Sequence, residues 1–322
     1  MFIWDNGLRL VKGDVAIDWT RRQPCGFVSH AHSDHLARHE ITLCTPETAR
    51  LCELRLKRKG RLHFKEMPYF QPISWGGLAL TTYPAGHILG SAMLHAVDEE
   101  TGQSLLFTGD FKLGPSATSQ EAVPVHADSL VMECTFGTPK HRLPPREETI
   151  ERFLEEIRRT FQQERTPVVY AYTLGKSQEI TKILTDAGIP VRQHTNIYAI
   201  SQVYESCGIT LGDVVELKER IAKNDRVLIV PPRVGLFETE TEPVTFAVTG
   251  WAIESSAKYR LGVDFAFPIS DHADYDDLIR MVELVAPKNV YCTHGPDSFV
   301  DRLLDLGFNA RPLDKPWQQR LF

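Results

Sequence analysis

Short apolar segments rich in β-branched residues alternate along the chain with longer segments that carry apolar residues every three or four positions. The short segments are typical of buried strands, and the longer ones of helices with one apolar face. We expect strands at 26–28, 78–82, 104–108, 129–132, 167–170, 226–230, 245–248 and 290–292. We expect helices at 46–59, 147–163, 177–187 and 274–285. This alternation predicts a mixed α/β fold.

A polar loop interrupts the alternation at residues 137–145, where prolines occupy positions 139, 144 and 145. Clusters of proline and polar residues between periodic segments are typical of loops and linkers. The block that follows, up to about residue 266, has strands and helices of its own. We therefore expect a second domain in this block.

A histidine-rich run, Ser29-His30-Ala31-His32-Ser33-Asp34-His35, follows the apolar segment 26–28 directly. In an extended backbone His30, His32 and Asp34 alternate and share one side, and His35 then begins the next turn. Imidazole and carboxylate are the ligand types that suit zinc and related divalent ions. The run therefore predicts a metal site, against the alternative of a surface loop that happens to be rich in histidine.

Further ligand candidates each stand just after an apolar run, at the place where a strand is expected to end. These are His87, Asp110, Glu133, His272 and His294. Strand carboxyl ends are where α/β sheets place their sites. One such histidine is more often a capped loop residue, but the repeated placement favours a shared site. Asp18, after 15–17, either orients a liganding histidine or only starts a turn.

The composition is that of an ordinary globular protein, with 322 residues, 42% of them hydrophobic and 24% charged. The formal net charge of −6 excludes a basic surface that coats nucleic acid, so any nucleic acid must be bound locally. The six cysteines form no Cys-x-x-Cys pair, which favours reduced, buried thiols. No segment resembles a membrane span or a signal peptide, so we expect a cytoplasmic protein.

Several motifs together resemble the metallo-β-lactamase superfamily. Residues 30–35 resemble its signature, and Ala-Gly-His at 85–87 and Thr-Gly-Asp at 108–110 resemble its third and fourth motifs. Segments 133–137, 270–275 and 293–295 resemble motifs A, B and C of its β-CASP nuclease branch. Residues 168–176 resemble the start of many β-CASP inserts, and Thr-Gly-Trp at 249–251 resembles an element of crosslink-repair DNA nucleases. The resemblance covers nearly the whole chain.

This resemblance implies an αββα metallo-β-lactamase fold with an inserted α/β β-CASP domain. Residues 1–144 and 267–322 would form the metallo-β-lactamase domain, and 145–266 the β-CASP domain. Two divalent metal ions are implied, with zinc favoured by the histidine-rich donors and manganese compatible with them. The implied ligands of one ion are His30, His32 and His87, those of the other are Asp34, His35 and His294, and Asp110 bridges the two.

The resemblance also implies roles beyond the ligands. His272 would contact the scissile phosphate or protonate the leaving oxygen, and Glu133 would orient a liganding or catalytic histidine. Asp34 and Asp18 complete the expected catalytic set, Asp34 as a metal ligand and Asp18 as the orienting carboxylate. A water activated between two metal ions can hydrolyse a phosphodiester.

Within the branch, the chain length and residues 133–148 look most like the bacterial exonucleases encoded beside an ATP-dependent DNA ligase and a helicase. We therefore expect a DNA exonuclease of DNA repair that starts at a 5′ end. Its expected partners are single-stranded or end-containing DNA and, functionally, such a ligase and helicase, with no membrane.

Two other functions stay open. A β-CASP ribonuclease is the main alternative, because His294 occupies a position where RNA-processing members carry histidine and eukaryotic DNA-repair members carry valine. A small-molecule hydrolase would use the same metal centre but would leave the insert, His272 and Glu133 without a role.

Overall fold

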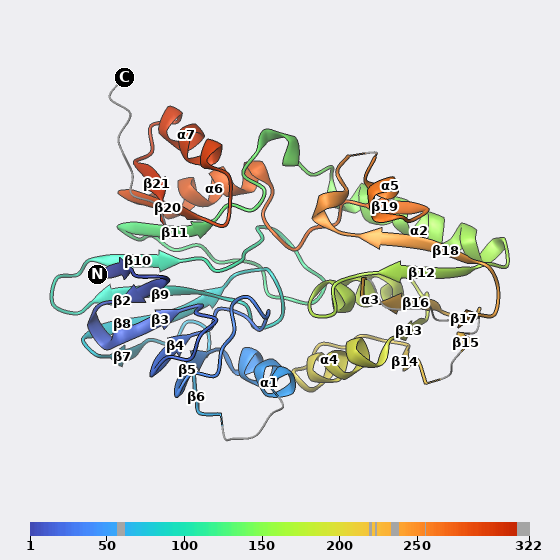
Figure 1. Cartoon of the computed structure of the whole chain (residues 1–322), viewed down its shortest axis with the longest axis horizontal. Helices are drawn as coiled ribbons and strands as arrows, with labels where there is room; N and C mark the ends of the chain where they lie inside the picture. Colours follow the sequence, from blue (N-terminus) through green and yellow to red (C-terminus); the bar gives the residue numbers. More distant parts are fainter. Residues whose placement is uncertain (57–61, 219–220, 223, 233–237, 255, 314–322) are drawn as a thin grey trace. The chain divides into compact units, whose positions relative to one another are not determined.

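A computed structural model describes residues 1–56, 62–218, 221–222, 224–232, 238–254 and 256–313. The chain divides into two compact units (Figure 1). Unit 1 comprises Met1–Pro115, Ser119–His141 and His272–Phe322, and unit 2 comprises Ser116–Thr118 and Arg142–Asp271. Unit 2 is thus inserted into unit 1, as expected for a β-CASP insert.

Unit 1 contains two β-sheets. The first has the strand order β1 (Phe2–Trp4), β2 (Leu8–Leu10), β3 (Val15–Ile17), β4 (Cys25–Phe27), β5 (Ile41–Cys44) and β6 (Phe64–Glu66). The second has the order β21 (Ala310–Pro312), β20 (Asn289–Thr293), β11 (Ser129–Glu133), β10 (Ser104–Phe107), β9 (Ala92–Asp98), β8 (Leu78–Pro84) and β7 (Ile73–Trp75). The strands from β3 to β6 and from β10 to β21 run parallel, whereas β7 to β10 are antiparallel neighbours.

Helices cover the outer faces of this pair of sheets. On β10, Leu105 and Phe107 point into the core between the sheets, while Leu106 points into the core beneath α6 (Tyr275–Val285) and α7 (Asp297–Asp305). This two-residue period follows from the pleat, and it requires both faces of the second sheet to be covered. Helix α1 (Pro46–Arg55) contacts β6 of the first sheet and is capped by the Thr45 side chain. The result is the αββα arrangement of the metallo-β-lactamase fold.

Strand direction places the carboxyl ends of six strands at matching edges of the two sheets. These strands are β3, β4, β8, β10, β11 and β20. In the second sheet β8 and β10 are both antiparallel to β9, so they run the same way as each other and as β11 and β20. In the first sheet β3 and β4 are parallel. The carboxyl ends of parallel strands are where α/β sheets place functional side chains. Every candidate residue except His272 follows or ends one of these six strands.

Unit 2 is built on one parallel sheet. Its strand order is β14 (Val214–Glu216), β13 (Val191–Gln193), β16 (Val227–Val230), β12 (Thr166–Tyr170), β18 (Pro243–Val248) and β19 (Phe265–Phe267). Its helices are α2 (Arg146–Gln162), α3 (Lys176–Asp186), α4 (Thr195–Ser206) and α5 (Ala257–Leu261). A separate ribbon pairs β15 (Ile221–Ala222) with β17 (Glu238–Thr239). Because all six strands of the main sheet are parallel, its loops also gather at one carboxyl edge.

The domain boundaries differ from the expected ones by a few residues. The expected boundary between residues 266 and 267 would cut through β19, which pairs with β18. Phe267 and Ile269 are both buried in the core of unit 2, and this packing carries its limit to Asp271. The sequence placed 267–271 in the other domain because a strand of three residues gives little local signal.

The eight expected strands and four expected helices all overlap elements of the structure. The helix expected at 46–59 ends at Arg55, and residues 57–59 lie outside the described part of the chain. The sequence did not predict β9, α4 or α7, among other elements. Strand β9 has the sequence Ala-Met-Leu-His-Ala-Val-Asp, in which alanine and aspartate weaken the strand pattern.

The six cysteines are free thiols, five of them buried, in line with the absence of Cys-x-x-Cys pairs. In the parts of the chain that the structure describes, no helix is long and apolar enough to cross a membrane.

Leu106 offers a test of this packing. Leu106→Ala should lower the free energy of unfolding by about 2–5 kcal/mol, because it leaves a cavity under α6 and α7. Leu284→Ala is the matched control, since Leu284 lies on α6 with 49% of its surface exposed, and it should change stability by about 0.5 kcal/mol or less. Urea unfolding followed by tryptophan fluorescence measures both, and equal effects would contradict the layer assignment.

Candidate metal centre

The histidine-rich segment after β4 is a turn, so the expectation of an extended segment is wrong. The backbone N–H of His35 donates to the carbonyl of His32 at 3.2 Å, and the chain reverses at Ser33 and Asp34. His30 and His35 are buried, whereas the Asp34 side chain is 78% exposed. The turn brings His35 back toward His30, with ring centroids 4.2 Å apart, and leaves Asp34 at the rim.

Four side chains from three strand ends form one compact group of donors. The Nδ1 atom of His32 lies 3.0 Å from Nε2 of His30 and 3.2 Å from Nε2 of His87. Asp110 Oδ2 lies 3.4 Å from the His30 nitrogen and 3.8 Å from the His87 nitrogen. Ligand atoms around a tetrahedral zinc ion with bonds of roughly 2.0–2.1 Å lie about 3.3 Å apart. The donors thus have the chemistry and the spacing to hold one divalent ion.

A second group begins at the same Asp110 oxygen. His35 Nε2 lies 3.4 Å from Asp110 Oδ2 and 3.8 Å from Asp34 Oδ2. The rings of His35 and His294 are 5.9 Å apart between centroids. Asp110 therefore lies within reach of both His30 and His35, and whether Asp34 and His294 join His35 in holding a second ion stays a prediction.

Asp18 supports both groups from behind. Its Oδ2 accepts a hydrogen bond from His35 Nδ1 at 2.7 Å and another from the Ser29 hydroxyl at 2.6 Å. Its Oδ1 accepts the Ser29 backbone N–H at 2.7 Å. A carboxylate that holds the far nitrogen of an imidazole fixes its ring orientation and leaves Nε2 to face the ion. The geometry is that of the orienting carboxylate rather than of a simple turn residue.

Ser29 was not among the expected site residues. Its hydroxyl bonds Asp18 and lies 3.0 Å from Nδ1 of His30, so it links the carboxylate to the first group. Only its position directly before His30 could have indicated this.

The charged states of these side chains follow from burial and from each other. Burial holds the pKa of His30 well below its usual value, assisted by the positive charge of His35 and opposed by Asp110. For His35, burial lowers the pKa, but the carboxylates of Asp18 and Asp110 outweigh it and raise the pKa to about 11. Burial would raise the pKa of Asp110, yet His35 holds it well below its usual range. Two carboxylates therefore draw positive charge to the position of His35.

Two glycines allow the ligand loops to approach each other closely. Gly86, with φ +79°, precedes His87, and a Cβ there would lie 2.1 Å from the carbonyl oxygen of Lys112. Gly109, with φ +56°, precedes Asp110, and its Cβ would lie 2.7 Å from the Ser29 side chain. Side chains rarely adopt this left-handed backbone, so only glycine fits both the conformation and the space.

His272 lies beside this centre in contact with Glu133. Its Nδ1 is 2.9 Å from Glu133 Oε1, and since an ionised carboxylate only accepts, the imidazole donates. Glu133 is 2% exposed and also accepts the Phe111 N–H at 2.9 Å and the Thr135 hydroxyl at 2.5 Å. The ring of His272 lies 4.6 Å from that of His87 between centroids. With Nδ1 engaged, Nε2 is the nitrogen that can serve a substrate.

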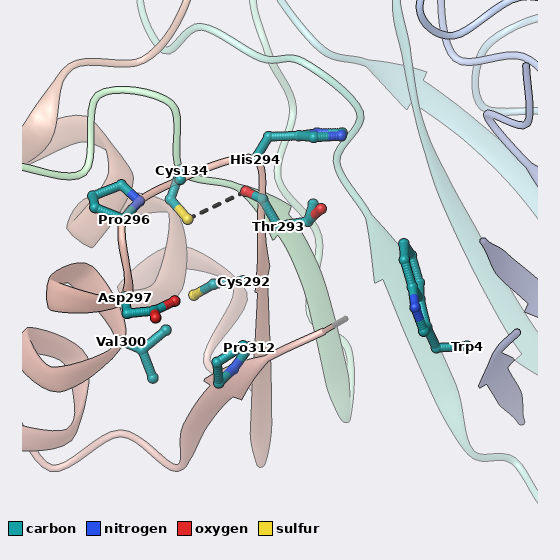
Figure 2. A pocket seen from close by; sticks show the side chains of 10 residues that line it. Trp4, Cys134, Cys292, Thr293, His294, Pro296, Asp297, Val300 and Pro312 are labelled. Atoms are coloured by element: carbon teal, nitrogen blue, oxygen red, sulfur yellow. Dashed lines mark hydrogen bonds between the residues drawn. The ribbon is translucent and has the colours of Figure 1, made fainter. Parts of the chain in front are cut away.

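His294 stands at the mouth of a pocket of about 250 Å³ (Figure 2). Cys134 and Cys292 lie deeper in this pocket, and the Cys134 thiol donates to the Thr293 carbonyl at 3.2 Å. Figure 2 shows the His294 imidazole pointing away from both thiols. His294 is exposed and has a left-handed backbone, with φ +54°. His294 is thus a lining residue of this pocket whose imidazole faces away from the two thiols.

The chain is similar to several known proteins. Residues 265–310 match a family described as the Zn-dependent metallo-hydrolase RNA specificity domain. A probable DNA ligase of Opitutus terrae is 36% identical over 315 residues, which are 95% of this chain and 31% of that protein. Cleavage and polyadenylation specificity factor subunit 3 of Dictyostelium discoideum is 31% identical over 147 residues, 44% of this chain and 18% of that protein. These matches support the assignment of the chain to the β-CASP branch of the metallo-β-lactamase superfamily.

The chain spans less than a third of the length of either of these two relatives. A crystal structure of a protein of unknown function from Enterococcus faecalis matches 84% of this chain and 75% of its own, with a TM-score of 0.58. At 16% sequence identity this likeness concerns the fold alone.

Asp18 gives a test of the supporting layer. Asp18→Asn should weaken zinc binding about 10- to 100-fold, because it removes the negative charge that orients His35. Asparagine has nearly the same volume as aspartate, so the substitution leaves no cavity in the fold. Competition with a chromophoric chelator measures the affinity. Asp305→Asn, an exposed aspartate on α7, is the matched control and should bind zinc like the wild type. Equal affinity of all three proteins would remove Asp18 from the metal centre.

Proposed function

We propose that this chain is a metal-dependent nuclease that hydrolyses phosphodiester bonds of DNA from an end. The observation that carries the proposal is the convergence of three imidazoles and one buried carboxylate at ligand spacing, with the His272–Glu133 pair beside them. Relatives in the β-CASP branch support hydrolysis of nucleic acid rather than of small molecules. The inserted unit and His272 then both have a role.

In this proposal His30, His32 and His87 would hold one ion, Asp34, His35 and His294 would hold the other, and Asp110 would supply the carboxylate that lies near both groups. When bound, two divalent ions supply a nucleophilic water and positive charge for the attacking and leaving oxygens. Zinc suits the imidazoles, and manganese tolerates the same donors. The exposed Asp34 and His294 are the ligands with most freedom to adjust.

His272 acts on the leaving group. Its Nδ1 donates to Glu133, so a proton on Nε2 can pass to the leaving oxygen of the cleaved diester. Glu133, anchored by Phe111 and Thr135, holds the ring in place and stabilises its protonated form. Asp18 keeps His35 oriented during the reaction.

DNA is favoured because the relative that matches 95% of this chain is named a probable DNA ligase. A longer protein with that name also supports a functional association with a DNA ligase. The helicase, the 5′ start and the role in repair rest on the resemblance of the motifs. A β-CASP ribonuclease is the second candidate, favoured by the description of residues 265–310 as an RNA specificity domain and by His294.

End-labelled single- and double-stranded DNA and RNA of matched sequence decide between the two. We expect DNA to be shortened from one end with zinc or manganese present, and not with a chelator. Asp110→Asn should retain less than about 1% of the activity, because it removes the carboxylate charge shared by both donor groups. Asp305→Asn is the control. Preferential cleavage of RNA would favour the second candidate, and full activity of Asp110→Asn would exclude the metal mechanism.

His272→Ala separates proton transfer from metal binding. We expect kcat to fall about 100- to 10,000-fold while the zinc content and affinity stay those of the wild type. A leaving group that needs no proton, such as p-nitrophenolate, should recover most of the rate. Loss of zinc in this variant would instead make His272 a metal ligand.

A further inference from the structure

Three aromatic side chains of unit 2 are strongly exposed although the metal centre does not use them. Tyr172 is 59% exposed, Trp251 is 45% exposed and Tyr259 is 78% exposed. Large aromatic side chains are usually buried, and clusters of exposed ones mark binding surfaces. Trp251 belongs to the Thr-Gly-Trp element, to which the nuclease mechanism gives no role.

The fold explains why these residues gather at one edge of the sheet. Strands β12 and β18 are parallel neighbours, with Tyr170 opposite Ala247. Tyr172 follows β12, and Trp251 lies in the 3₁₀ turn Gly250–Ala252 after β18. Both residues therefore leave the carboxyl edge of the sheet, where open parallel sheets bind ligands.

Helix α5 adds the third aromatic residue and two cations. Arg260 on α5 donates to the Trp251 carbonyl at 2.9 Å, which ties the helix to the turn. Lys258 Nζ lies 5.0 Å from the centre of the Tyr259 ring. Residues 250–262 contain these two cations and one carboxylate, Glu254, whereas the chain as a whole carries a charge of −6. Aromatic faces and positive charge are thus interleaved on one short segment.

We propose that Trp251 and Tyr259, with Lys258 and Arg260, bind single-stranded nucleic acid, and this proposal rests on the nuclease function proposed above. Every base presents a π-face that stacks on an aromatic ring, and the cations meet the phosphates between the bases. Tyr172, at the neighbouring strand end, extends the same edge. Paired bases are stacked on each other and do not offer these faces, so the surface selects unpaired strands.

Binding is measured by fluorescence anisotropy with a labelled single strand of about 12 nucleotides, in the Asp110→Asn background so that the strand stays intact. We expect Trp251→Ala and Tyr259→Ala each to weaken binding about 10-fold, and Trp251→Phe to restore most of it. Lys258→Gln should reduce the slope of the logarithm of the binding constant against the logarithm of the salt concentration by about one. Lys218→Gln is the matched control in unit 2, because the Lys218 side chain is 78% exposed, and it should bind like the parent.

Hydrolysis of bis(p-nitrophenyl) phosphate keeps this test separate from that of the nuclease function. This small diester reports the metal centre alone, so its hydrolysis by the wild type and by Lys218→Gln tests the nuclease function without the stacking surface. If both alanine variants bind the single strand as tightly as the parent, or if the parent prefers duplex, the stacking surface is wrong. If the wild type hydrolyses no diester with either metal, the nuclease function fails instead.

Discussion

Asp110 is 8% exposed, and its carboxylate faces three imidazoles. The arrangement of the centre depends on the positive charge that this buried carboxylate requires. An ionised carboxylate taken out of water costs several kcal/mol unless a cation and hydrogen bonds compensate it. Asp18 adds a second such carboxylate on the far side of His35. The pair creates a place for cations, and His30, held neutral by burial, supplies a lone pair there.

Holding these groups together requires backbone conformations that chains otherwise avoid. Asp18 and His294 have φ +51° and +54°, and Gly86 and Gly109 have positive φ at the residues before two candidate ligands. For the two non-glycine residues the strain is about 1–3 kcal/mol each. The surrounding packing tolerates it because the six strand ends on which these loops stand are fixed in two rigid sheets. The centre therefore draws its precision from the cores on both sides of the second sheet.

The sequence indicated the site better than it indicated the local path of the chain. The position of a polar residue after each apolar run predicted that His87, Asp110 and His294 lie at strand ends. The common direction of β8, β10 and β20 then places these ends at one edge of the second sheet. Alternation failed for the histidine run, since a single hydrogen bond from His35 to His32 converts an extended segment into a turn. The domain limit after β19 was missed for a related reason: burial of Phe267 and Ile269 depends on long-range packing that no local pattern carries.

Glu133 joins two functions that the sequence suggested separately. Its Oε1 receives both the imidazole of His272 and the N–H of Phe111, the residue directly after Asp110. His272, the proposed proton donor, and Phe111, which follows the proposed ligand Asp110, are therefore held by one oxygen atom at the end of β11. Glu133 Oε2 accepts the Thr135 hydroxyl in addition, so the two oxygens of this buried glutamate together satisfy three donors.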